Sequence, residues 1–192
     1  MPRFTAPRRL ALGLGASALL VASIAGPAFA ADTVTQVIAG GGLAASVANL
    51  TLPSVIYQNA AHDVTGTMTL TADDQTDSAA GWNVTIQTSA FVWVGPVNGG
   101  IDIPAGSLAL TSAAVPVRIA GQAVAPAAAT GPQVPPTSPI GTLDTPRKTI
   151  SATAAYGSGT YSQALGITLT IPAMSHVGTY TGTLTTTITS AP

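Results

Sequence analysis

The residue types that usually carry catalysis are scarce in this 192-residue chain. It contains no cysteine and no glutamate, and no Gly-x-Ser-x-Gly sequence that would present a serine nucleophile at a strand-to-helix turn. A glycosidase needs two carboxylates at a fixed separation, and only aspartates in turn-like sequence are available. We therefore predict a protein that is not an enzyme and that uses no cofactor.

Two small groups of residues have the chemistry of metal ligands. Asp73, Asp74 and Asp77 cluster in one stretch, but calcium needs six or more oxygens, and their spacing is not that of an EF-hand loop. Aspartate is also a preferred turn residue, which favours a solvated turn. His62 and His176 stand beside turn residues without a further ligand at zinc spacing. We predict no metal site.

The aromatic residues are the remaining candidates for binding. Trp82 begins a period-2 series with Val84 and Ile86, so packing in a β-sheet core is the favoured interpretation, and a sugar-stacking platform is the alternative. The candidate contact residues for a ligand or a cell-wall polymer are Trp82, Trp93, Tyr156, Tyr161 and Tyr180.

Trp93 is the better placed of the two tryptophans for such a contact. The stretch Phe91–Val94 is apolar at every position and leads directly into a turn at Gly95 and Pro96. A strand with this pattern is buried on both faces, or it is a strand end whose exposed face forms a contact patch.

Threonine dominates the chain after residue 30, and its spacing predicts the elements that position these side chains. Every odd position from Thr179 to Thr189 is threonine, and the same alternation runs through residues 64–71, 82–86 and 165–171. A period of two indicates strands with one buried and one solvated face, and no stretch keeps a helical period. We predict an all-β fold of nine or ten short antiparallel strands in a single β-sandwich or Greek-key-like domain.

The first 30 residues have the features of a secretion signal. Arg3, Arg8 and Arg9 precede an apolar run over residues 10–24, and Ala28-Phe29-Ala30 fits a cleavage site. The predicted mature chain, 31–192, has three basic and seven acidic residues and a net charge of −4. Three scattered cations cannot neutralise a run of phosphates, which argues against nucleic acid as a partner. We also expect no transmembrane anchor in the mature form.

One segment, at about residues 121–147, does not fit the strand pattern. It contains six prolines and almost no periodicity. The residues after it hold about three strands, which are too few for an independent core. We therefore predict a long proline-rich surface loop within one domain rather than a linker between two.

Two stretches together resemble the WxL domain of secreted bacterial surface proteins. They are Gly66–Asp74 running into Ala80–Ile86, and Tyr156–Tyr161 followed by Leu169–Pro172 and Gly178–Pro192. The first motif keeps Trp82 but has Val84 in place of leucine, and the second has Thr186 and Ile188 in place of tryptophan and leucine. The resemblance implies an exported, threonine-rich, all-β protein that attaches non-covalently to peptidoglycan.

These observations predict a secreted, non-catalytic module associated with the bacterial cell wall. Its contacts would be aromatic and hydrogen-bonding because the net charge gives no attraction to anionic polymers. The alternative is a structural subunit that assembles with another surface protein or with copies of itself, through strand edges that carry few charges.

Overall fold

The computed structural model describes residues 36–96, 99–124, 131–137 and 139–190, so the predicted signal peptide lies outside the described residues. The fold described below is that of the compact unit Ile38–Pro192. Its strands are β1 (Leu43–Val47), β2 (His62–Asp74), β3 (Trp82–Thr88), β4 (Val92–Val94), β5 (Leu108–Ala113), β6 (Val117–Gly121), β7 (Gly141–Thr142), β8 (Arg147–Ala152), β9 (Gly159–Ile171), β10 (Thr179–Thr181) and β11 (Leu184–Ser190). Every strand pair is antiparallel, and the short 3-10 helix η1 (Ala105–Ser107) is the one helical element in the described residues. The predicted all-β class is confirmed.

The centre of the fold is the pair β2–β9. Each strand is 13 residues long, and they stay in register from the pair His62–Ile171 to the pair Asp74–Gly159. β1 pairs with the outer edge of β2, while β5 and β6 pair with the outer edge of β9, and β7 extends the sheet beyond β5. We call this six-stranded sheet the long sheet. The predicted alternation is confirmed in β2 and β9, where the apolar positions are buried more deeply than the threonines between them.

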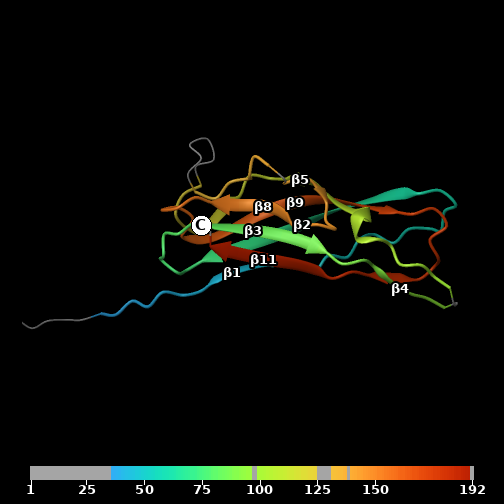
Figure 1. Cartoon of the computed structure of the whole chain (residues 1–192), viewed down its shortest axis with the longest axis horizontal. Coiled ribbons are helices and arrows are strands. Elements are labelled where there is room, and N and C mark those ends of the chain that lie inside the picture. Colours follow the sequence, from blue (N-terminus) through green and yellow to red (C-terminus); the bar gives the residue numbers. More distant parts are fainter. Residues whose placement is uncertain (1–35, 97–98, 125–130, 138, 191–192) are drawn as a thin grey trace, which may run out of the picture. The chain divides into compact units, whose positions relative to one another are not determined.

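A second sheet, in the order β11–β3–β8, is formed by shorter strands. We call it the short sheet; β3 and β11 run side by side in it and pair over seven residues (Figure 1). The two stretches that carry the WxL resemblance therefore meet here, with Thr186 opposite Ile86 and Ile188 opposite Val84.

The threonine-rich stretch at residues 179–189 is two strands rather than one. β10 pairs with β4 in a separate ribbon, and β11 pairs with β3. The break lies at Gly182 and Thr183, where the Ser89 hydroxyl accepts a hydrogen bond from the Thr183 amide at 2.9 Å. A Cβ at Gly182 would come within 2.9 Å of the Phe91 ring, so the chain crosses that ring at a residue without a side chain.

Both sheets contribute side chains to one hydrophobic core. Its fully buried members include Leu70 and Leu165 from the long sheet and Val84, Ile86 and Ile150 from the short sheet. Because the inner face of each sheet is apolar and the outer face is rich in hydroxyls, burial of these inner faces is the main stabilising contribution.

Trp82 closes the core at the end where β2 finishes and β3 begins. Its indole is fully buried, and Nε1 donates a hydrogen bond to the carbonyl of Gly157 at 3.0 Å. The Tyr161 ring, also fully buried, lies 6.1 Å from the Trp82 ring. Gly157 has φ +89°, and a Cβ there would overlap Ala152. The core-packing interpretation of Trp82 is therefore confirmed, and both rings are unavailable as contact residues.

The proline-rich segment is more than a surface loop. Part of it, residues 125–130 and 138, lies outside the described residues, but β7 falls inside the segment and Leu143 is fully buried. The Leu143 amide donates to Leu108 of the long sheet, and its carbonyl accepts from Thr88 of the short sheet, both at 2.8 Å. The prediction of a surface loop thus needs correction at Leu143, which connects the two sheets.

We expect Trp82→Phe to destabilise the protein by about 2–4 kcal/mol. The change removes apolar volume from a closed core and leaves the Gly157 carbonyl without its donor. Urea unfolding followed by far-UV circular dichroism measures the loss. Tyr156→Phe is the control because Tyr156 is 41% exposed and outside the buried core, and it should change the free energy of unfolding by less than about 0.5 kcal/mol. Equal effects of the two substitutions would contradict this account of the core.

We expect the stability of the folded protein to fall as the pH rises above about 10. Burial raises the pKa of Tyr161, with the Asp74 carboxylate adding to the rise and Arg118 opposing it. Since an unfolded tyrosine ionises near pH 10, alkali ionises the unfolded chain first and so favours unfolding. Chemical denaturation between pH 8 and 11 should show a smaller alkaline loss for Tyr161→Phe than for Tyr156→Phe. If the free energy of unfolding fell equally with pH in the two variants, the result would be inconsistent with a buried Tyr161 phenol.

Candidate functional site

The two sheets differ in strand length, and this difference creates the candidate site. β2 and β9 have 13 residues each, whereas β3 and β11 have seven. Six residues of strand correspond to about 20 Å, so the short sheet cannot cover the inner face of the long pair along its whole length. At the end marked by His62 and Ile171, a cavity of about 1160 Å³ lies between the long pair and the segments that cover it in place of the short sheet.

The inner wall of this cavity is apolar. Val64, Met68, Leu169 and Ile171 of the long pair line it, and these side chains continue the core pattern of their strands. Leu108 of β5, which pairs with Leu169, extends this wall, and Phe91, Ile103 and Leu184 also line the cavity. An apolar wall of this size matches the usual construction of a small-molecule binding site.

Residues 48–58 form the second wall, and we call this segment the strap. Its backbone hydrogen bonds in the described part of the chain lie at its ends, from the Ala48 amide to the Thr69 carbonyl at 3.4 Å and from the Met174 amide to the Gln58 carbonyl at 3.3 Å. Between these points the strap lies over Gly66, where a Cβ would be 2.7 Å from the Leu52 side chain. Few backbone hydrogen bonds hold the strap, so it can move at lower cost than the sheets.

The third wall is the segment 172–184, which contains β10. Tyr180 lines the cavity, and its hydroxyl donates to the His176 carbonyl at 2.9 Å. Burial raises the pKa of Tyr180, while its hydrogen bonds with Ser175 and His176 oppose the rise. Tyr180 is therefore a fixed, neutral hydrogen-bonding group beside an apolar space at any physiological pH.

Trp93 lies directly opposite Tyr180 in the β4–β10 ribbon. Its ring packs against glycines on both sides, and a Cβ at Gly95, Gly100 or Gly178 would overlap it. The His176 ring contacts it edge-on at a centroid distance of 6.1 Å. The ring is thus held in place by its neighbours and is half-buried.

The strand around Trp93 is exposed on one face. Val92 and Val94 are 54% and 67% exposed, so the interpretation of a strand buried on both faces is wrong. The exposed face carries the valines, whereas Trp93 points to the covered side.

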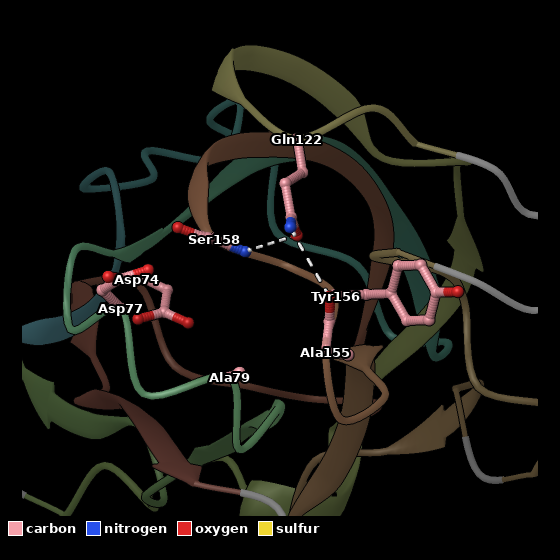
Figure 2. Close-up of a pocket in the computed structure, with 7 residues that line it drawn as sticks. All are labelled: Asp74, Asp77, Ala79, Gln122, Ala155, Tyr156 and Ser158. Carbon is pink, nitrogen blue, oxygen red and sulfur yellow. Dashed lines mark hydrogen bonds between the residues drawn. The ribbon is translucent and has the colours of Figure 1, made fainter.

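The five predicted contact residues do not gather into one site. Trp82 and Tyr161 are in the core, and Trp93 and Tyr180 are paired in the ribbon. Tyr156 belongs to a separate small cavity of about 40 Å³, and its ring points away from that cavity (Figure 2). The structure thus brings together Trp93 and Tyr180 as one pair and Trp82 and Tyr161 as another, and no aromatic platform forms from all five.

The aspartate cluster forms a hydrogen-bonded turn. Asp74 is buried and accepts hydrogen bonds from the amide and hydroxyl of Thr76, at 3.0 and 2.7 Å. Asp73 accepts from Thr160 on β9 at 2.7 Å. In the described residues, no three histidine, cysteine or acidic side chains come close enough together to hold a metal ion.

The lining of the large cavity contains no aspartate, lysine or arginine among the described residues. Its mouth is rimmed by exposed apolar side chains that also line it, namely Leu50, Val55, Ile56, Tyr57 and Val177. Exposed apolar side chains around an apolar cavity are typical of a binding surface. The strap carries no strand or motif pattern in the sequence, so this site could not be predicted from it.

Comparisons of the chain with family models, curated proteins and solved structures found no match in any of the three. The WxL resemblance therefore stays a prediction. Among the described residues, the structure contains no helix with the length and apolar character needed to cross a membrane.

We expect Gly100→Ala to displace the Trp93 ring because the added Cβ would overlap it. The variant should unfold at lower urea concentration, with a loss of about 1–3 kcal/mol, and its tryptophan emission should shift to longer wavelength. Gly42→Ala is the matched control, since a Cβ at Gly42 meets no atom within 4 Å. Unchanged emission in Gly100→Ala would contradict the described packing of Trp93.

Proposed function

We propose that this protein is a secreted, non-catalytic module of the bacterial cell surface and that the cavity beside the strap is its binding site for an apolar ligand. The observation that carries the proposal is the cavity of about 1160 Å³ that lies beside β2 and β9 and is lined by the strap and by the segment 172–184. Secretion rests on the signal sequence, and the surface location rests on the resemblance described above.

Exposure of apolar surface to water costs a free energy of about 25 cal/mol per Å². The cavity-lining side chains Ile56 and Val177 are exposed, so the protein gains free energy when a ligand covers them. The lack of charged side chains in the described lining favours apolar or neutral ligands, because an ionic group placed there would lose its hydration without a partner.

Attachment to peptidoglycan through stacked aromatic rings has less support from the geometry. Trp82 and Tyr161 are buried, and the Trp93 ring is half-buried and packed against glycines. Wall association is still compatible with the exposed Tyr156 and with the hydroxyl-rich outer face of β2 and β9. In this proposal, wall association determines where the protein is located, and the cavity binds the ligand.

Assembly with another surface protein or a second copy is the other candidate function, and one feature favours it. All five residues of β6 are exposed, including Val117 and Ile119, and the strand pairs only with β9. The last strand, β11, is paired with β3 of its own chain along its length, so it is not free to be supplied to a neighbour.

We expect the neutral dye N-phenylnaphthylamine to bind with enhanced fluorescence and micromolar affinity. Ile171→Glu places a carboxylate in the cavity and should weaken binding at least tenfold, whereas Val117→Glu, on the exposed strand β6, should not change it. Fluorescence titration at neutral pH measures both affinities, after urea unfolding has shown that both variants are folded. Failure of the dye to bind, or equal weakening by the two substitutions, would exclude the cavity as the binding site.

A further inference from the structure

We infer that the ligand of the cavity is a single-chain amphiphile, whose hydrocarbon chain lies on the wall formed by β2 and β9 and whose polar head pairs with His62. This inference rests on the proposed binding function and adds the class of ligand and the residue that recognises it.

The lining favours a hydrocarbon chain. The deepest wall is aliphatic, with Val64, Met68, Leu169 and Ile171 in two adjacent strands. Side chains on one face of a strand repeat about every 7 Å, so this wall is an elongated apolar strip that suits an extended chain. The cavity would hold about 40 water molecules, and a hydrocarbon chain would displace them from apolar surface.

His62 provides the polar contact. It lines the cavity at the first position of β2, opposite Ile171. Its Nδ1 and Nε2 atoms are both buried and without a hydrogen-bond partner, and among the residues of the described chain with unpaired buried polar atoms, His62 alone belongs to the cavity lining. Because both nitrogens are shielded from solvent in the free protein, the head group reaches them only when the side chains that cover them move aside. A neutral imidazole has one donor and one acceptor, so a hydroxyl, amide or ester head group can satisfy it.

The opening lies under the strap. The strap is tied at Ala48 and Gln58, and its apolar residues Val55 and Ile56 are exposed at the mouth. Displacement of the strap breaks no strand pairing, because residues 48–58 belong to no strand. A chain that enters there meets exposed apolar side chains first and the aliphatic wall next, and closure of the strap brings the head group to His62.

The first test is the dependence of affinity on chain length. Calorimetric titration with 1-hexanol, 1-octanol and 1-decanol should show binding that tightens about fourfold for each added methylene, the increment expected for full burial. Equal affinities across the series would overturn the inference, because a chain that does not enter the cavity gains nothing from its length.

The second test compares head groups. The wild-type protein should bind 1-decanol about fivefold more tightly than decyl methyl ether, which can accept a hydrogen bond but not donate one. His62→Phe should remove this preference. His62→Gln, which keeps a donor and an acceptor, should retain most of it. His176→Phe is the matched control because it removes the other cavity-lining histidine, and it should leave the preference unchanged.

The outcomes separate the inference from the proposed function. If the neutral dye binds and Ile171→Glu weakens it, but His62→Phe keeps the preference for the alcohol, the cavity remains the binding site and the assignment of His62 is wrong. If neither the dye nor the alcohols bind, both the inference and the proposed function are wrong. Loss of the preference in His62→Phe alone, with the dye still bound, supports the inference.

Discussion

The inner face of a 13-residue strand pair has to be covered, and a seven-residue sheet covers only part of it. The rest of the structure follows from this mismatch. At one end, Trp82 and Tyr161 fill the space between the sheets, and the indole hydrogen bond to Gly157 closes it. At the other end the strap and the segment 172–184 take the place of the short sheet, with Leu52 packed against the core, and a cavity remains between these segments and the long pair.

The two ends therefore differ in how tightly they are held. Around Trp82, the indole Nε1 and the Tyr161 hydroxyl are both hydrogen-bonded, and an added Cβ at Gly81 or Gly157 would clash with neighbouring atoms. Around His62, both ring nitrogens lack partners and apolar side chains reach solvent. These unpaired atoms and exposed apolar side chains are unfavourable in the free protein, and a bound ligand can pair or cover them. The packing at the closed end provides the stability that offsets their cost.

Much of the fold could be predicted from the sequence, because alternation of threonine with apolar residues identifies strands whatever their partners are. The same alternation correctly predicts that Trp82 lies in the core. Strand pairing was harder: the threonines from 179 to 189 alternate without interruption, yet the chain breaks at Gly182, where it crosses Phe91. The cavity depends on the relative lengths of strands that pair far apart in sequence, and periodicity contains no such information. The burial of Leu143 could not be predicted for the same reason, because its backbone hydrogen bonds join it to two sheets whose strands are distant in sequence.

Amide hydrogen exchange with and without a saturating long-chain alcohol tests the central claim most directly. If the mismatch between the sheets leaves an apolar binding space under the strap, the amides of residues 48–58 should exchange quickly in the free protein, since most of them have no backbone partner. They should become protected when the alcohol binds, together with residues 172–184, while the amides around Trp82 stay unchanged. Strap amides that are already slow in the free protein, or protection spread evenly over both ends, would contradict the account.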